Sequence, residues 1–213
     1  ETTGGYEEAT IGSACAVVET GKRPKGGVAR YVTGTPSLGA ESIGGLAQFN
    51  FSKVKYVPEE FAREMRKGKV ESRDVLVYKD GGTPGNFIPK VGMLGDGFPF
   101  QDFVINEHVF RVRGNDLVSQ EFLYFWLASS ELISEMARAG TGAEIPGMKS
   151  TNFKAIPVVI PPKEIREHLY PVLHDIVSAA LALACENRTL IQTRDELLPL
   201  LMSGRVRVGD EVA

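Results

Sequence analysis

The hydrophobic pattern divides the chain into two segments that differ in composition and in the spacing of their apolar residues. In residues 1–160, short runs of β-branched and aromatic residues alternate with turns rich in glycine and proline, which predicts short strands joined by long loops. From Lys163 to about Met202 there is no glycine, and apolar residues recur at spacings of three and four. The change falls at Ile160-Pro161-Pro162. We therefore expect one unit over 1–160 and a long helix within 161–213.

The first segment is predicted to be of mixed α+β type. Val75–Tyr78 and Val104–Val112 have the composition of buried strands. A helix is predicted over Pro58–Met65, because proline suits the first turn and the two glutamates that follow suit the helix dipole. A second helix is predicted from Ser119, a good N-cap, to Gly140, a good C-terminal stop, with its aromatic stripe in the core.

The second segment has the heptad pattern of a coiled coil. Its seam consists of Ile165, Leu169, Val172, Ile176, Ala179, Leu183, Leu190, Leu197 and Leu200. Only Glu186 and Thr193 interrupt the seam with polar side chains. A helix of this length would extend roughly 55 to 60 Å, more than a small domain can cover, so it needs a partner helix. Pro171 predicts either a kink or a long straight part that begins at about Tyr170.

The charge is unevenly distributed along the chain. The formal net charge is −3, yet residues 21–90 contain 13 Lys or Arg against 7 Asp or Glu. A local positive patch is enough to displace counterions from nucleic acid, so the overall acidity does not exclude a DNA-binding role. Within this region, Arg63, Arg66, Lys67 and Lys69 have two interpretations: part of a basic face, or solvation of a helix end.

The residues that carry most enzyme chemistry do not form recognisable motifs. His108, His168 and His174 have no metal-ligand spacing, and Cys15 and Cys185 are interpreted as buried apolar residues. The glycine-rich run from Lys79 to Asn86 lacks the ending of a phosphate-binding loop and is predicted to be a turn. There is no nucleophile elbow, dinucleotide fingerprint or amino-methyltransferase tetrapeptide. We therefore expect neither catalysis, nor a metal, nor a cofactor.

Targeting signals are also missing from the sequence. No uninterrupted apolar run approaches the roughly 18 residues that span a bilayer, and the first residues do not have the pattern of a signal peptide. We expect no membrane association and a cytoplasmic location.

Several stretches, in this order and spacing, resemble the specificity subunits of type I restriction-modification systems. The stretches are 18–27 (VETGKRPKGG), 34–43 (GTPSLGAESI), 67–70 (KGKV) followed by 74–81 (DVLVYKDG), 140–142 (GTG), 149–153 (KSTNF), 156–162 (IPVVIPP) and 197–204 (LLPLLMSG). Two features depart from the family. Lys163-Glu164 follows the two prolines where the family usually has Glu-Gln, and there is no internal repeat, although a full subunit resembles two tandem copies.

The resemblance implies half of a specificity subunit: a target recognition domain over 1–160 and a spacer helix over 161–213. Such a unit reads one part of a split double-stranded DNA site and carries no catalysis. Its implied partners are the methyltransferase subunit, the restriction subunit, and a second specificity half or a second copy of itself. The chain is either the C-terminal half of a longer subunit, since Leu201-Met202-Ser203-Gly204 resembles a chain end, or a half-sized subunit that dimerises.

Specific residues are expected to carry these contacts. Lysine and arginine suit guanine or phosphate, and asparagine suits adenine. The candidates for DNA contact are Lys22, Arg23, Lys25, Ser37, Lys79, Asn86, Lys90 and Lys149, with Ser150 as a residue that equally suits a helix cap. The candidates for the coiled-coil interface are Leu169, Val172, Ile176, Leu183, Leu190 and Leu197.

Two other functions remain open from the sequence. One is the recognition part of a single-chain restriction-methylation enzyme, which a methyltransferase motif upstream of Glu1 would favour. The other is a coiled-coil scaffolding protein without a DNA role, which salt-dependent DNA binding would exclude.

Overall fold

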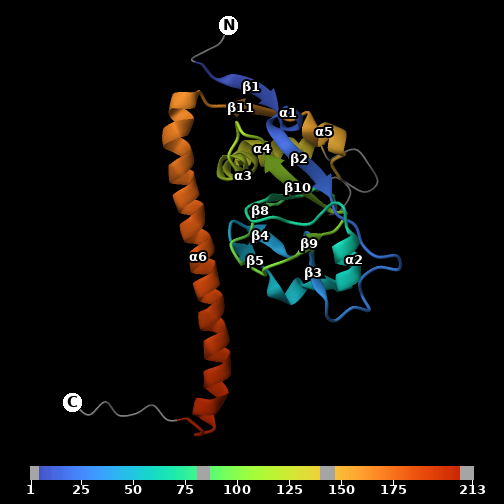
Figure 1. The fold of residues 1–213 in the computed structure, drawn as a ribbon, viewed down its shortest axis with the longest axis vertical. Helices are drawn as coiled ribbons and strands as arrows, with labels where there is room; N and C mark the ends of the chain where they lie inside the picture. Colours follow the sequence, from blue (N-terminus) through green and yellow to red (C-terminus); the bar gives the residue numbers. More distant parts are fainter. Residues whose placement is uncertain (1–4, 81–86, 140–146, 207–213) are drawn as a thin grey trace, which may run out of the picture.

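A computed structural model describes residues 5–80, 87–139 and 147–206. The helices and strands are, in chain order, β1 (Glu7–Thr10), α1 (Ile11–Ala14), β2 (Cys15–Thr20), β3 (Thr35–Leu38), β4 (Ile43–Gly45), β5 (Gln48–Phe49), the 3-10 turn η1 (Phe51–Lys53), β6 (Lys55–Val57), α2 (Glu59–Glu64), β7 (Val75–Tyr78), β8 (Val91–Met93), β9 (Val104–Ile105), β10 (Val109–Gly114), α3 (Gln120–Leu127), α4 (Ser130–Ala139), α5 (Ser150–Lys154), β11 (Pro157–Ile160) and α6 (Lys163–Met202). Figure 1 shows a strand-rich domain with α6 lying along one side of it.

The centre of the domain is a four-stranded antiparallel sheet in the order β2-β10-β7-β8. Val75, Leu76, Val77, Val109 and Val112 on its central strands are almost fully buried. A three-stranded sheet, β6-β3-β9, lies beside it and includes the parallel pair β3 and β9. Strands β1 and β11 pair antiparallel, so the start of the domain is joined to the segment that leads into α6.

The predicted strands are partly correct. The strand predicted over Val75–Tyr78 is β7. The strand predicted over Val104–Val112 is two strands, because the chain turns at Asn106. The Asn106 side-chain oxygen accepts a hydrogen bond from the His108 backbone N–H at 2.9 Å, which is the local bond that asparagine uses to make a turn.

The helix predicted from Ser119 to Gly140 is also two elements, α3 and α4. Ser119 caps α3 as predicted, since its hydroxyl accepts from the Phe122 N–H at 3.1 Å. Ser129 starts a new helix in the same way, accepting from the Leu132 N–H at 3.4 Å. The helix predicted over Pro58–Met65 is confirmed, with Pro58 as the N-cap and Glu59–Glu64 in the helix.

Helix α6 is continuous from Lys163 to Met202 and contains both Pro171 and Pro199. At 1.5 Å per residue it extends about 60 Å. Val177 and Leu181 are fully buried against the domain. Beyond them, the C-terminal part of α6 extends past the domain (Figure 1). The predicted α+β class, with a strand-rich domain followed by a long helix, is thus confirmed.

Helix α6 is also long and apolar enough to cross a membrane by length and composition. An 18-residue window within it has a mean hydropathy of 1.3, and 11% of that window is buried. One such helix is weak evidence for a membrane segment, because helices of other kinds pass the same test.

Candidate nucleic-acid interface

Four shallow hollows adjoin one another on the domain and together form the candidate interface. Their volumes range from about 430 to 560 Å³. Neighbouring hollows share lining residues: Arg23, Asp80, Glu107, Lys22 and Thr20 each line two of them. The surface is therefore continuous rather than a set of separate pockets.

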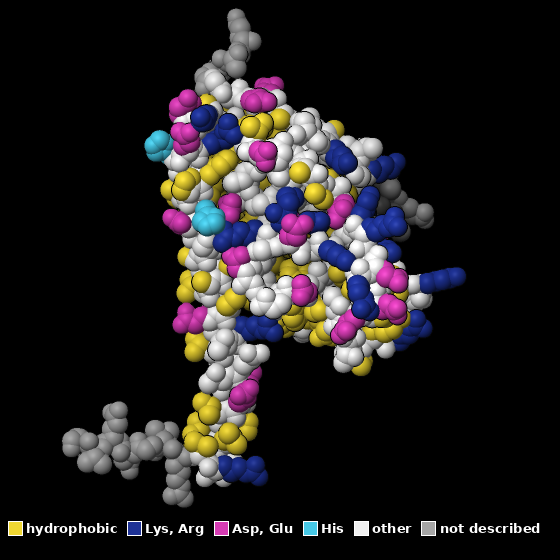
Figure 2. Space-filling model, viewed as in Figure 1, with side chains coloured by type: hydrophobic (Ala, Val, Ile, Leu, Met, Phe, Trp, Pro, Cys, Tyr) yellow, Lys and Arg dark blue, Asp and Glu magenta, His cyan; other side chains and the backbone are white. Residues whose placement is uncertain are grey.

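Eight lysine and arginine side chains line these hollows, against four carboxylates. We call this surface the basic face, and its cations are Lys22, Arg23, Lys53, Lys55, Arg66, Lys67, Lys79 and Lys149. Figure 2 shows many of the Lys and Arg side chains, with Asp and Glu among them, on the side of the domain away from α6. A continuous group of cations of this kind suits the phosphates of a nucleic acid.

The loop between β2 and β3, residues 21–34, supplies part of the basic face. Its base is held by close packing, because a Cβ on Gly21 would lie 1.6 Å from the Ile105 carbonyl oxygen. Further along, Gly26 and Gly27 have positive φ angles and open space around them. Lys22 lies over the Phe61 ring at 5.1 Å. The loop is thus anchored at its base and open where Lys25 is exposed.

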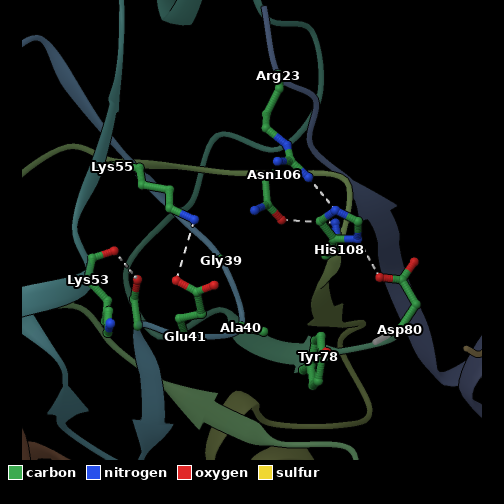
Figure 3. Close-up of a pocket in the computed structure, with 11 residues that line it drawn as sticks. Arg23, Gly39, Ala40, Glu41, Lys53, Lys55, Tyr78, Asp80, Asn106 and His108 are labelled. Carbon is green, nitrogen blue, oxygen red and sulfur yellow. Dashed lines mark hydrogen bonds and ion pairs between the residues drawn. The ribbon is translucent and has the colours of Figure 1, made fainter. Parts of the chain in front are cut away.

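The hollow drawn in Figure 3 combines hydrogen-bond donors and acceptors. The Arg23 guanidinium pairs with Glu107 at 2.6 Å and contacts the His108 ring. The Nδ1 atom of His108 lies 2.5 Å from Asp80, and Asp80 also pairs with Lys79 at 2.6 Å. Each charged group in this row touches a group of the opposite sign or a polar ring, which holds the side chains in defined positions.

Burial and ion pairing have opposite effects on the pKa of the Glu107 carboxyl. Burial is the largest single influence and raises the pKa of this carboxyl, but the hydrogen bond from Arg23, a backbone hydrogen bond and the neighbouring positive charge together outweigh burial, so the pKa lies below its ordinary value. The second carboxylate oxygen is buried without a hydrogen-bond partner among the described residues. Glu107 is therefore ionised at neutral pH and tied to Arg23, so Arg23 can turn toward another anion only by leaving Glu107.

The rim of the same hollow carries a second ion pair. Lys55 and Glu41 are 3.4 Å apart, and both are largely exposed. Tyr78 and Asn106 also line the hollow. Asn106 is 8% exposed, and its side-chain oxygen is already occupied by the His108 N–H. Such a mixture of cations, an amide and an aromatic ring can contact both phosphates and base edges.

The structure brings together four of the eight residues predicted for DNA contact. Lys22, Arg23, Lys79 and Lys149 all line the basic face. Lys25 and Lys90 are exposed but line none of its hollows. Ser37 is only 3% exposed within β3, so we leave it out of the candidate interface. Asn86 lies outside the described residues. Ser150 lines one hollow and is the first residue of α5, whereas Lys149 holds the N-cap position.

Several residues of the basic face were not among the predicted contacts. Lys53, Lys55, Tyr78, Asn106 and His108 come from separate strands and turns, and no short motif connects them. The sequence signal for Lys53 and Lys55 was the excess of positive charge over residues 21–90, and Asn106 and His108 lie outside that range. Of the four cations with two open interpretations, Arg66 and Lys67 line a hollow next to Lys22.

A buried group of charges supports the base of this surface. Arg111 is 9% exposed at its side chain and binds Glu19 at 3.1 Å, Glu71 at 2.6 Å and Asp74. Burial raises the pKa of the Asp74 carboxyl, against the lowering effect of Arg111. Glu19 also accepts a hydrogen bond from the Gly68 N–H at 2.8 Å. Because its charge is already satisfied, Arg111 is a structural residue that fixes the turn next to Lys67 and Lys69.

The second candidate interface is on α6. Val172, Ile176, Leu183, Leu190 and Leu197, which we call the apolar strip, are 41% to 58% exposed. Leu169, predicted for the same interface, is instead half-buried against the domain. An exposed apolar row of this length is typical of a surface that binds another protein.

Comparisons with known proteins agree with the predicted resemblance. Over 104 residues, which is 47% of this chain, the sequence is 28% identical to the type I restriction enzyme HindI specificity subunit of Haemophilus influenzae. The fold is similar to the HsdS subunit from Thermoanaerobacter tengcongensis, with a TM-score of 0.53 and 16% identity over 88% of this chain. It is also similar to a chain in a structure concerned with complex assembly and conformational transition of the type I R-M system, with a TM-score of 0.56 and 17% identity over 94% of this chain. No protein-family model matches the chain.

The chain spans less than half the length of each of these proteins. The matched part is 22% of the HindI subunit, and the fold matches 40% and 44% of the two solved chains. The resemblance to one half of a type I specificity subunit is thereby confirmed.

Proposed function

We propose that the chain recognises one half of a bipartite double-stranded DNA site, as half of a type I specificity subunit. The observation that carries this proposal is the basic face, which places cations from the 21–34 loop, from β6 and from the α2–β7 turn around adjoining hollows. The cations supply phosphate contacts, and the polar side chains of the hollow around His108 supply contacts to base edges. The similarity to HindI and HsdS specificity subunits supports the same assignment.

The two regions have separate roles in this proposal. Residues 1–160 form the target recognition domain, and residues 161–213 contain the spacer helix. The apolar strip pairs with the spacer helix of a second specificity half or of a second copy, and the methyltransferase and restriction subunits dock around this pair. The chain itself has no catalytic activity and binds no cofactor. It acts in the cytoplasm, where its DNA target is accessible, and not on a membrane.

Selection from a pool of random duplexes tests the proposal. The purified chain is incubated with the pool at near-physiological salt, and bound duplexes are amplified through several rounds. We expect one short sequence to be enriched, because sequence-specific contacts survive at salt concentrations that weaken phosphate contacts. Retention of duplexes without enrichment would reduce the chain to a nonspecific binder. No retention at low salt would instead favour the scaffolding function.

The single-chain restriction-methylation enzyme remains the second candidate for the recognition role. Both candidates predict the same enrichment, so catalysis separates them. Supplied with S-adenosylmethionine, ATP and magnesium, the purified chain should neither methylate nor cut the enriched duplex. Activity that copurifies with the chain through successive columns would contradict the non-catalytic assignment.

A further inference from the structure

Helix α6 is attached to the domain by directional polar contacts as well as by apolar packing. Val177 and Leu181 are buried against the domain, and Leu173 and Ala184 pack beside them. Apolar contacts of this kind resist separation but do little to fix the rotation or tilt of a helix, because they are not directional. Hydrogen bonds are directional, so the polar contacts along α6 decide how precisely it is held.

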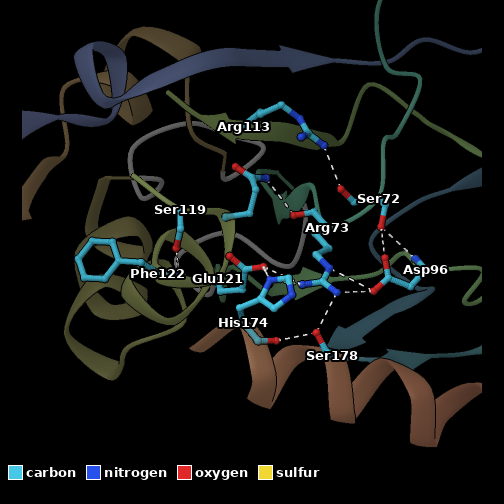
Figure 4. Close-up of polar contacts among 10 residues, drawn as sticks. Ser72, Arg73, Asp96, Arg113, Ser119, Glu121, Phe122, His174 and Ser178 are labelled. Carbon is cyan, nitrogen blue, oxygen red and sulfur yellow. Dashed lines mark hydrogen bonds and ion pairs between the residues drawn. The ribbon is translucent and has the colours of Figure 1, made fainter. Parts of the chain in front are cut away.

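Arg73 is the first of these contacts, and it projects from the turn that precedes β7 (Figure 4). Its backbone has a φ of +65°, which is uncommon for a residue other than glycine. The guanidinium donates to Asp96 at 2.7 Å and to Glu121 at 2.9 Å, both on the domain. It also lies 2.8 Å from His174 Nδ1 and donates to the Ser178 hydroxyl at 3.0 Å, both on α6.

The planar guanidinium therefore joins two parts of the domain to two consecutive turns of α6. Its hydrogen bond to Asp96 raises the pKa of Arg73 and lowers that of Asp96, so both groups are charged at neutral pH. Lysine offers a single charged point and cannot make this planar set of contacts.

Arg188 is the second contact, further along the helix. Its guanidinium donates to the Pro99 carbonyl and lies over the rings of Phe51 at 5.0 Å and Phe100 at 5.4 Å. From Ser178 to Arg188, α6 rises about 15 Å. Near the start of the helix, Arg166 and Tyr170 each donate to the Leu117 carbonyl at 3.0 Å. The domain thus holds α6 at three levels along its length.

We propose that Arg73 and Arg188 are positioning residues that fix the angle between the recognition domain and α6, and through it the spacing between the two halves of the DNA site. This inference rests on the proposed function. Beyond Arg188, α6 continues for 14 residues to Met202, about 21 Å. A tilt of about 10° at Arg188 would move that end by about 4 Å, close to the rise of roughly 3.4 Å per base pair. A loosened attachment would therefore accept more than one spacing.

A distance measurement between two spin labels tests the rigidity directly in this chain. The labels are attached at Glu131→Cys on α4 and Glu196→Cys on α6, in a background of Cys15→Ala and Cys185→Ser. We expect a narrow distance distribution in the parent and a distribution several ångströms broader in the Arg73→Met, Arg188→Met double variant. Arg194→Met is the matched control, because Arg194 pairs only with its neighbour Asp195 among the described residues. Equal widths in parent and double variant would overturn the inference.

Binding to duplexes with two half-sites at varied spacing tests the consequence for recognition. The parent, in the assembly that it forms through α6, should prefer one spacing by at least tenfold, roughly the penalty of one mismatched base pair. The double variant should accept neighbouring spacings with less than threefold loss, while its affinity for a single half-site changes by less than about twofold. If the double variant does not fold, Arg188→Met alone is used, since it leaves the buried contacts of Arg73 intact. An unchanged spacing preference in a folded variant contradicts the positioning role, whereas absence of half-site binding by the parent contradicts the proposed function.

Discussion

The 21–34 loop offers a sharp prediction, because its cations differ in how they are held. Lys25 is exposed and has no ion pair among the described residues, and Lys22 is exposed above the Phe61 ring. Arg23 is paired with Glu107. Replacing the two lysines by alanine removes two cations that form no ion pair among the described residues, so it leaves no carboxylate unpaired. Replacing Arg23 as well leaves the Glu107 carboxylate unpaired next to the DNA.

The magnitude follows from counterion release. Each phosphate contact contributes about 0.9 to the magnitude of the slope of log affinity against log salt. The slope of the Lys22→Ala, Lys25→Ala variant should therefore be smaller in magnitude by about 1.8. Between about 50 mM and about 200 mM salt, the affinity of the parent should therefore fall about 12-fold more than that of the variant. Adding Arg23→Ala should lower the affinity by more than the loss of one phosphate contact would, because the unpaired Glu107 carboxylate then repels phosphate.

Fluorescence anisotropy with a labelled duplex over a salt series measures these slopes. Lys163→Ala is the matched control, since Lys163 is an exposed cation at the start of α6 whose one ion pair within the described residues is with Glu167. Circular dichroism establishes that each variant is folded. An affinity and slope equal to those of the parent in the folded double variant would remove the loop from the DNA interface.

Three further predictions concern the helix, acid stability and cysteine chemistry. Leu183→Asp with Leu190→Asp should abolish self-association or assembly in sedimentation, because buried unpaired carboxylates cost several kcal/mol. Gln192→Asp, on the opposite side of α6, should leave the association intact. Equal sedimentation of the parent, the double variant and Gln192→Asp would refute the apolar strip as an interface. Arg73 lowers the pKa of Asp96 below 3.8, so the stabilisation by ionised Asp96 is present above that pH and is lost as the pH falls through the lower, folded value. In Asp96→Asn, the free energy of unfolding measured with urea should therefore fall less steeply as the pH is lowered into the acid range. An unchanged pH dependence would argue against the Arg73–Asp96 pair. Burial raises the pKa of the Cys15 thiol to about 12, so mass spectrometry should find Cys15 unalkylated by iodoacetamide at pH 8 until the protein is unfolded.

The fold could be predicted where the signal is local. The strand at Val75–Tyr78, the helix after Pro58 and the long helix from Lys163 each carry an apolar run or a cap within a few residues. The errors also have local causes. Ser129 has the chemistry of a helix cap but lies inside a continuous apolar periodicity, and that periodicity concealed the end of α3. Asn106 turned the chain within a run of strand-forming residues.

The site was less predictable, because its residues meet only through the tertiary fold. Arg111 lies within the strand predicted over Val104–Val112, yet its carboxylate partners Glu19, Glu71 and Asp74 lie on other segments of the chain. His108 meets Arg23 and Asp80 across 85 and 28 positions in the sequence. Charge density along residues 21–90 indicated the region that contains Lys22, but it could not show that the Ser37 side chain is buried within β3.

The apolar strip on α6 could be predicted in part from the sequence. Its heptad spacing predicts which residues share one side of a helix, and Ile176, Leu183, Leu190 and Leu197 do remain exposed on α6. The same spacing could not predict which part of the helix the domain itself would cover. Leu169 packs against the domain, as do Val177 and Leu181 from outside the seam.

The central claim is that the basic face reads a DNA sequence, and one affinity ratio tests it most directly. The chain is titrated at about 150 mM salt against the duplex enriched by selection and against a scrambled duplex of equal length and composition. Complete sites are typically bound at least ~10³-fold more tightly than nonspecific DNA, and a half-site carries roughly half of that free energy, so we predict a ratio of about 30 or more. Equal affinities for the two duplexes would contradict the claim, because they would leave only phosphate contacts.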